Sequence, residues 1–519
     1  MSDITIEKQP DELFGHPKGL FILFLTEMWE RFSYYGMRGL LIFYLTQHFL
    51  FSDEKSFAIY GAYTALVFLT PVLGGALADR YLGARKAVIL GAILLVLGHA
   101  GMAIEGPPAI EAVNGAGFTD IVRDQFYLQV FYLSLALIIA GVGFLKANIS
   151  TIVGSLYEQD DPRRDSGFTL FYMGINLGSF SASLLCGYLG QTYGWAYGFG
   201  AAGVGMLFGL IVFLKGQRLL MGYTELHNST VLKESVWLGL NREGLIYAGT
   251  FIGVLVLWQL IQHQQRVGDV LGGFGAVVLA VILFYAFNKC KPEERDRMLV
   301  ASVLMFMSVI FFALFEQAGS SLNLLADRHM DRQVLGIDIK ASQLQSLNPL
   351  FIFIFAPIVS VGWIWLARRG WEPSTPLKFA LGILLVGLGF LVMVYGASHT
   401  EANGQVALIW LVLLYLLHTL GELSLSPVGL SMITRLSVKR MVGFMMGAWF
   451  LSLSAASFIA AQIAKVTGAE THSGEVMDKA AALNSTIDVY WNVGCMAVLI
   501  ALSLAILSPF LKKGMHGVH

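Results

Sequence analysis

The sequence predicts an all-α protein that crosses a membrane many times. Of its 519 residues, 56% are hydrophobic and 13% are charged, against about 25% charged residues in a soluble domain. Apolar runs of about twenty residues recur along the chain, and each can cross the roughly 30 Å hydrocarbon core of a bilayer. We therefore expect a polytopic membrane protein. Its net charge of −1 gives no reason to expect nucleic acid as a partner.

About fourteen spans are expected, in two sets of six joined by a pair. The first set covers residues 19–48, 57–79, 86–105, 126–155, 168–190 and 195–215. The pair covers 244–262 and 268–288, and the second set covers 297–326, 342–367, 377–397, 405–432, 441–466 and 487–511. We accordingly expect an N-terminal bundle (1–215), a linker with two extra helices (216–296) and a C-terminal bundle (297–519). Two such halves suggest a transporter with its site between them at mid-membrane.

The basic residues predict the orientation. With the N-terminus in the cytoplasm, 23 of the 34 Lys and Arg residues fall in cytoplasmic segments, 8 fall outside and 3 lie within the membrane. Cytoplasmic loops carry an excess of Lys and Arg. We therefore expect both termini in the cytoplasm and the protein in the cytoplasmic, or inner, membrane.

The stretch from Thr26 to Leu40 carries four formal charges inside an apolar run. On a helix that turns about 100° per residue, one face collects Glu27, Glu30, Arg31, Tyr34, Tyr35 and Arg38. A charge at the bilayer centre costs roughly 2.5–3.5 kcal/mol on insertion scales. This face must therefore point at protein or at a water-filled cavity.

Three further ionisable residues fall within expected spans: Lys146 in the first half, and Glu316 and Glu422 in the second. This separation of charge favours a zwitterionic cargo. Its carboxylate would meet Arg38 and Lys146, and its ammonium group would meet Glu422. Structural ion pairing is the alternative for any one of these charges, but seven of them over both halves favour a functional role.

Buried carboxylates are also natural proton carriers. We expect Glu27, Glu30 and Glu316 to take up protons, because a proton that neutralises a glutamate frees its arginine partner for a substrate carboxylate. Aromatic candidates for lining apolar pockets, each with plain packing as its alternative, are Tyr34, Tyr35, Tyr63, Phe315 and Trp449.

Other motifs are weaker. The segment from Gly74 to Val88 connects the second and third expected spans, and we expect a gating hinge there, formed by Gly75, Asp79 and Arg85, with a plain basic loop as the alternative. The GxGxxG pattern at 198–203 lies inside an apolar span, so it indicates helix packing and not a dinucleotide site. We expect no metal, and no cofactor apart from coupling protons.

Two stretches resemble signatures of the proton-coupled oligopeptide transporter (POT) family within the major facilitator superfamily. ExxERFxYYG at 27–36 resembles the first-helix signature, and FYxxINxGS at 171–179 resembles the fifth-helix signature. The loop at 74–86 is similar to the superfamily motif between helices two and three. The resemblance covers essentially the whole chain, including two inserted spans typical of bacterial members.

The resemblance implies the major facilitator fold and proton-driven uptake of di- and tripeptides by alternating access. The partners would be peptides, protons and the lipid bilayer, and we expect a monomer. Positions that match those around the peptide are Tyr35, Arg38 and Lys146 at its carboxylate end, Asn176, Asn348 and Glu422 at its amino end, and Trp449 in a side-chain pocket. Positions that match those of proton coupling and gating are Glu27, Glu30, Arg31 and Glu316.

Two positions depart from the family pattern. Phe68 stands where many members carry a tyrosine, so one polar contact is missing. Gly61 stands where animal members carry a histidine, so proton coupling should rest on carboxylates.

Two other functions stay open at this point. One is import of another small anion, such as nitrate or a carboxylate metabolite, since related plant proteins share the first-helix signature. The other is a membrane-bound sensor or enzyme, against which stands the lack of a soluble domain or a catalytic grouping in the sequence.

Overall fold

The computed structural model describes residues 12–113, 119–158, 160–220, 222, 235–237, 240–400, 404–472 and 475–518. The expected cytoplasmic N-terminal segment 1–11 and part of the linker, at 221, 223–234 and 238–239, lie outside these residues. Long helices dominate the described part, as the apolar runs predict.

The helices follow the expected spans closely. The first group comprises α1 (Lys18–Phe43), α2 (Asp53–Leu77), α3 (Ala84–Met102), α4 (Gln125–Ser155), α5 (Arg164–Tyr193) and α6 (Trp195–Gly216). The linker holds α7 (Arg242–Gln262) and α8 (Gln264–Lys289). The last group comprises α9 (Pro292–Phe315), α10 (Ser321–His329), α11 (Leu347–Arg368), α12 (Thr375–Ala397), α13 (Leu408–Leu436), α14 (Val442–Val466) and α15 (Lys479–Gly514).

Thirteen helical segments of the described chain are long and apolar enough to cross a membrane. The four charges of α1 set it apart, yet its 26 residues match the length of its neighbours. One of the thirteen is the expected span 297–326, which is divided into α9 and α10 by a 3₁₀ turn at Glu316–Gly319. The prediction of an all-α polytopic membrane fold is confirmed.

Short strands occupy the connections between helices. Five antiparallel pairs join β1 (Glu12–Leu13) with β2 (His16–Pro17), β3 (Ile110–Val113) with β4 (Thr119–Val122), β5 (Ser235–Trp237) with β6 (Leu240–Asn241), β8 (Gln333–Val334) with β9 (Ile337–Asp338), and β11 (Thr471–His472) with β12 (Glu475–Val476). A parallel pair joins β7 (Met330–Asp331) with β10 (Val406–Ala407).

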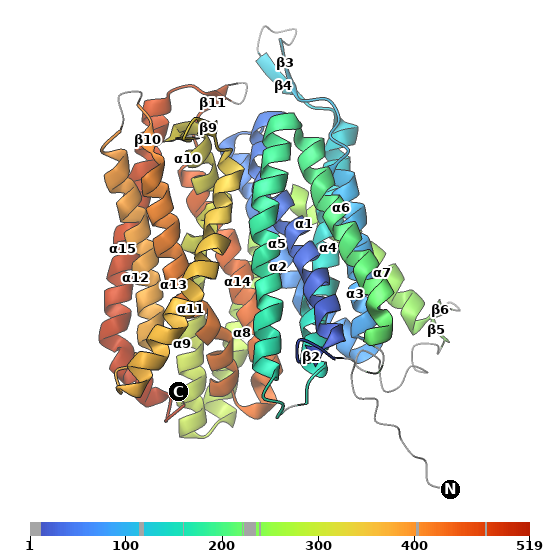
Figure 1. The fold of residues 1–519 in the computed structure, drawn as a ribbon, viewed down its shortest axis with the longest axis vertical. Helices are drawn as coiled ribbons and strands as arrows, with labels where there is room; N and C mark the ends of the chain where they lie inside the picture. The colour runs from blue at the N-terminus through green and yellow to red at the C-terminus, as the bar shows by residue number, and fades with distance from the viewer. Residues whose placement is uncertain are drawn as a thin grey trace.

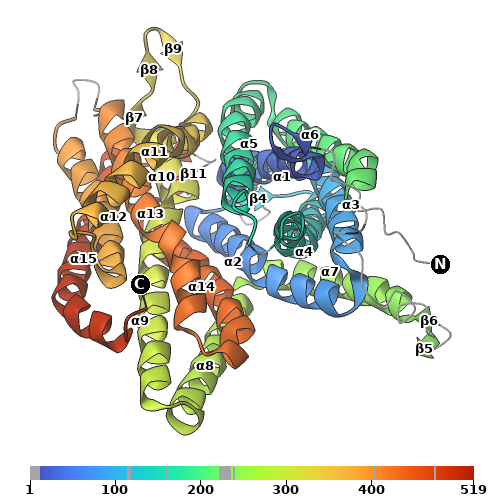
Figure 2. The same cartoon turned by 60° about the horizontal axis from the view of Figure 1, so that its bottom comes forward.

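Helices α1–α6 stand beside helices α9–α15, with α7 and α8 along one side (Figures 1 and 2). In Figure 1, β3, β4, β9, β10 and β11 lie at the upper end, while β2 and the C-terminus lie at the lower end. The boundaries of the expected bundles, 1–215, 216–296 and 297–519, stay a proposal.

Small residues let the helices cross closely within the first group. A Cβ atom added at Gly74 of α2 would collide with the carbonyl group of Gly143 in α4, and one at Gly178 of α5 would collide with the Met28 carbonyl of α1. Close crossings of this kind replace interdigitated side chains in membrane proteins. They hold the charged face of α1 at a fixed angle.

The GxGxxG pattern lies in α6, as predicted, and serves helix packing. A Cβ atom at Gly198 would overlap Leu40 of α1, and one at Gly203 would touch His99 of α3 at 3.3 Å. The dinucleotide interpretation is thereby excluded.

The connection between α2 and α3 is more helical than expected. A π turn at Ala78–Leu82 continues α2, and Gly83, with φ of +79°, alone separates it from α3. Only a residue without a Cβ atom adopts this left-handed conformation without strain. The expected hinge residues Gly75, Asp79 and Arg85 therefore lie on both sides of a single left-handed glycine, and their role as a hinge stays a prediction.

Helices α2 and α14 join the two groups. A Cβ atom at Gly61 would overlap the Cβ atom of Ala461, and Ser454 Oγ donates to the Ala65 carbonyl oxygen at 2.6 Å. A histidine at position 61 has no room in this arrangement, which gives a structural reason for the departure noted in the sequence.

We predict that Gly61→Ala destabilises the protein by about 1–3 kcal/mol, because even one methyl group overpacks this crossing. The thermal unfolding midpoint of the purified protein measures the effect. The control is Gly272→Ala in α8, where an added Cβ atom meets nothing within 4 Å. An unchanged midpoint for Gly61→Ala would contradict the close crossing.

Candidate functional site

A polar cavity of about 180 Å³ lies between the two groups of helices. Its walls come from α1, α2 and α5 on one side and from α9, α11 and α13 on the other. The lining residues are Tyr35, Arg38, Phe68, Ser179, Ser183, Phe312, Phe315, Glu316, Ala318, Gln345, Asn348, Tyr415, His418 and Glu422. Three charged residues predicted from the sequence, Arg38, Glu316 and Glu422, therefore line one cavity.

Arg38 and Glu316 form an ion pair across the two groups. Both side chains are nearly buried, at 9% and 11% exposure, and Arg38 Nε donates to the Tyr60 hydroxyl at 2.6 Å. Glu316 begins the 3₁₀ turn that interrupts the α9–α10 span. The break thus places a carboxylate opposite the arginine of α1.

A second polar set lines the opposite wall. Asn348 Nδ2 donates to Glu422 Oε2 at 2.9 Å and to Thr419 Oγ1 at 3.1 Å. These contacts join α11 to α13. The cavity therefore offers a cation on the α1 side and a hydrogen-bonded carboxylate on the α13 side, as the charge pattern predicts.

The other charged residues of α1 form a separate cluster. Arg31 Nε lies 2.8 Å from Glu27 Oε1 and 3.0 Å from Glu30 Oε2, and all three side chains are buried. Both Glu30 oxygens and Glu27 Oε2 have no hydrogen-bond partner among the described residues. Lys146 of α4 lies within electrostatic range of both glutamates. The cluster balances two carboxylates with two cations.

Lys146 also touches the wall of the cavity. Its Nζ atom lies 4.5 Å from the ring centroid of Phe68, within the range of a cation–π interaction, and Phe68 lines the cavity. Phe68 thus presents the face of its ring to the ammonium group of Lys146.

Besides Lys146, three expected substrate-binding residues do not line the cavity. Tyr34 is buried and its hydroxyl has no partner in the described part of the chain. Asn176 donates to the Tyr172 carbonyl oxygen of its own helix at 3.1 Å. Trp449 of α14 packs against Gly429 of α13, where a Cβ atom would lie 2.5 Å from the indole.

The expected gating residues lie at the lower end of α2 and α3. A Cβ atom on Gly75 would lie 3.3 Å from Ala147 of α4, next in sequence to Lys146. Asp79 is exposed in the π turn and Arg85 is half-buried in the first turn of α3. Gly75 and Asp79 precede the left-handed Gly83 in the sequence and Arg85 follows it. All three stay candidates for a hinge.

Sequence reasoning missed Tyr60 and selected Tyr63. Tyr63 is buried with an unpaired hydroxyl among the described residues, whereas Tyr60 binds Arg38. Both are tyrosines of one apolar span, so the sequence offers no signal to choose between them. His418 also lines the cavity, and its Nε2 atom is 3.2 Å from the Val386 carbonyl oxygen.

Polar contacts join the two groups of helices at the upper end. Arg328 binds Asp53 through two contacts of 2.6 and 2.8 Å, and the Ala469 amide donates to the same carboxylate at 2.9 Å. Ser342 Oγ donates to Gln191 Oε1 at 2.6 Å. These contacts join the two groups above the level of Arg38.

We predict a coupling energy of about 0.5–3 kcal/mol between Asp53 and Arg328. Removing one partner leaves the other charge unpaired. The double alanine variant should therefore lower the thermal unfolding midpoint by less than the sum of the two single variants. The exposed neighbour Glu54 provides the control, since Glu54→Ala should change stability by less than about 0.5 kcal/mol. Strict additivity of the two single variants would contradict the pairing.

Two facing groups of membrane-spanning helices around a charged central cavity define a multi-pass membrane transporter. A family model described as the POT family matches residues 85–481. A *Bacillus subtilis* protein described as an uncharacterized transporter, YclF, is 38% identical over 515 residues, which are 97% of this chain and 96% of that one. The chain belongs to the POT family and is a transporter, not an enzyme, as the resemblance implies.

Other relatives carry more specific names. The peptide transporter YePEPT of *Yersinia enterocolitica* is 38% identical over 87% of this chain and 88% of that one. Dipeptide and tripeptide permease A of *Salmonella typhimurium* is 32% identical over 98% and 96%. A solved mutant of the peptide transporter POT in complex with alafosfalin superposes with a TM-score of 0.79 and 35% identity over 98% and 97%. The major facilitator fold is thus confirmed.

Proposed function

We propose that the protein imports di- and tripeptides together with protons, by alternating access to the central cavity. The observation that carries the proposal is the Arg38–Glu316 ion pair, which lies inside the cavity and joins its two walls. The names of the relatives support a peptide as cargo, and one solved POT structure contains 5-aminolevulinic acid, a small zwitterion.

The distribution of Lys and Arg supports an inner-membrane protein with both termini in the cytoplasm. The lower end of Figure 1 would then be cytoplasmic. Because the contacts of Asp53 and Gln191 join the groups at the upper end, we assign this conformation to the state closed toward the outside. We keep the monomer as a proposal, although one structural neighbour is described as tetrameric.

A bound peptide would span the cavity. Its carboxylate would replace Glu316 on the guanidinium group of Arg38, which offers a planar bidentate contact. Its ammonium group would meet Glu422, which Asn348 already orients. Lys146 would add a second cation from behind Phe68.

Protons would act by removing charge from the ion pairs. A proton on Glu316 cancels its attraction to Arg38, so the link between the two walls of the cavity weakens and the guanidinium group becomes available for the peptide carboxylate. A proton on Glu30 would likewise weaken its contact with Arg31. Glu27, Glu30, Arg31 and Glu316 are thus the proposed coupling residues, with Gly75, Asp79 and Arg85 as the proposed hinge.

The cargo assignment predicts that Arg38→Ala or Lys146→Ala reduces uptake of labelled dipeptide at least about tenfold, since each loses a charged contact worth about 1.5–3 kcal/mol. Uptake into proteoliposomes with an inward proton gradient measures this. Lys513→Ala, at an exposed position, is the control. Competition by nitrate and by free amino acids tests the alternative cargo, and gradient-driven uptake of labelled nitrate without uptake of labelled dipeptide would refute peptide transport.

The coupling assignment predicts that Glu316→Gln separates exchange from accumulation. A glutamine cannot take up a proton or form the ion pair with Arg38, so the cavity should still exchange labelled for unlabelled dipeptide. Gradient-driven accumulation should fall to the level of gradient-free vesicles. Accumulation that still follows the proton gradient in this variant would assign coupling to the Glu27–Glu30 cluster.

A further inference from the structure

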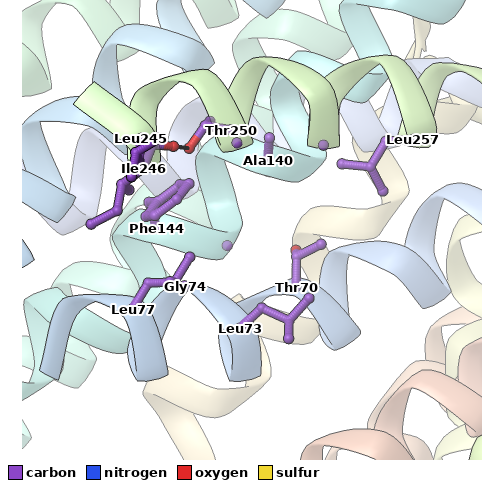
Figure 3. A pocket seen from close by; sticks show the side chains of 13 residues that line it. Thr70, Leu73, Gly74, Leu77, Ala140, Phe144, Leu245, Ile246, Thr250 and Leu257 are labelled. Atoms are coloured by element: carbon purple, nitrogen blue, oxygen red, sulfur yellow. Dashed lines mark hydrogen bonds between the residues drawn. The ribbon is translucent and has the colours of Figure 1, made fainter. Parts of the chain in front are cut away.

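A second cavity, of about 410 Å³, lies apart from the central site, between α7 and the crossing of α2 with α4 (Figure 3). We call it the α7 groove. The side chains in Figure 3 extend from three helices into a common space. Its lining residues are Thr70, Leu73, Gly74, Leu77, Ala140, Gly143, Phe144, Leu245, Ile246, Gly249, Thr250, Gly253 and Leu257.

The groove presents an apolar surface. Its two hydroxyl groups are used internally, since Thr70 Oγ1 donates to the Ile139 carbonyl oxygen at 3.0 Å and Thr250 Oγ1 donates to the Ile246 carbonyl oxygen at 2.8 Å. No lining residue is charged. A peptide or an ion would lose its hydration here without compensation, so the fitting ligand is a hydrocarbon chain.

Glycines keep the groove empty of side chains. A Cβ atom added at Gly249 or Gly253 would meet nothing within 4 Å. Two small residues four positions apart, such as Gly249 and Gly253, usually let a second helix pack closely. Here they line the groove, and no helix fills the space beside them. Only 11% of an 18-residue apolar stretch of α7 is buried within the protein, so the helix largely faces the bilayer.

Ties at both ends fix the width of the groove. Lys86 Nζ donates to both carboxylate oxygens of Glu243 at 2.7 Å at the lower end, and Gln129 Nε2 donates to Gln262 Oε1 at 3.2 Å toward the upper end. A groove of about 410 Å³ between helices that are tied at both ends favours a single acyl chain over a further helix, whose diameter is about 10–12 Å.

The lower mouth of the groove is basic. Arg80, Arg85 and Lys86, at the α2–α3 junction, and Arg242, at the start of α7, stand against the two acidic residues Asp79 and Glu243. The Lys86 side chain is 41% exposed and uses two of its three ammonium donors on Glu243. Basic residues beside an acyl-chain slot suit an anionic headgroup.

We propose that the α7 groove binds an anionic phospholipid of the inner leaflet, with one acyl chain between α7 and the α2–α4 crossing and the headgroup at Lys86 and Arg242. The lipid would connect the linker helix to the junction that holds Gly83. This site is separate from the central cavity and does not depend on the cargo.

Unfolding midpoints of the detergent-purified protein test the site with phosphatidylglycerol and with phosphatidylcholine of the same acyl chains. Phosphatidylglycerol should raise the midpoint by roughly 3 °C more than phosphatidylcholine does. The double variant Gly249→Leu with Gly253→Leu fills the groove and should lose this difference. The matched control is Gly272→Leu with Gly275→Leu in α8, where added Cβ atoms also meet nothing within 4 Å.

A headgroup variant, Lys86→Gln with Arg242→Gln, should reduce the effect of phosphatidylglycerol to that of phosphatidylcholine. Its control is Lys512→Gln with Lys513→Gln, two exposed lysines near the C-terminus. Photocrosslinking of the wild-type protein by phosphatidylglycerol with a diazirine acyl chain gives a readout that needs no variant, and the label should map to peptides of α2, α4 and α7.

Four results would overturn the proposal. The first is a full phosphatidylglycerol effect in the groove-filled variant, and the second is equal protection by the two lipids in the wild type. The third is a wild-type dimer in light scattering that the groove-filled variant dissolves, because the groove would then be an interface between two copies. Label confined to other helices would decide against the site even where a variant fails to fold.

Discussion

The cost of an unpaired charge inside a membrane governs the arrangement of this protein. Arg38 cannot face lipid, so α1 must turn its charged face toward the second group of helices. There Glu316, in the 3₁₀ turn between α9 and α10, forms the ion pair with Arg38. The same requirement gathers Glu27, Glu30 and Arg31 into one buried cluster. Each charge thus fixes the rotation of the helix that carries it.

Close helix crossings complete this arrangement. Two helix backbones meet without intervening side chains where Gly74 faces Gly143 and where Gly178 faces Met28. Such backbone contacts define the distance between the helices closely. Charged groups at hydrogen-bond distance need this precision. The glycines of the first group therefore help to position the charged side chains of α1.

The sequence predicted the spans and the chemistry of the cavity because both follow from local physics. Apolar length marks a span, and a charge inside one marks a site, so Arg38, Glu316 and Glu422 were found before their neighbours were known. Asn348 came only from the family resemblance. The choice of Tyr60 over Tyr63 depends on the rotation of α2, which three-dimensional packing alone decides.

Other features needed the fold. Asp53 and Arg328 are 275 positions apart and meet only because the start of α2 and the end of α10 lie at the same end of the molecule. Tyr34 follows from helix geometry in hindsight: it is one residue, or about 100°, from Tyr35, and this turn carries it from the cavity wall into the core. The α2–α3 connection was expected as a loop, since a π turn has no clear signal in sequence.

The contact between α2 and α14 has a mechanical consequence. It runs from Gly61 and Ala461 through Ala65 and Ser454 to Gly447, where a Cβ atom would lie 3.7 Å from Val72. The α2 and α14 residues named here are all small except Val72, so at these points the two helices meet through short side chains. Under the proposed alternating access, these short side chains would let α2 and α14 shift against each other, and the contacts of Asp53 and Gln191 at the upper end would resist the motion.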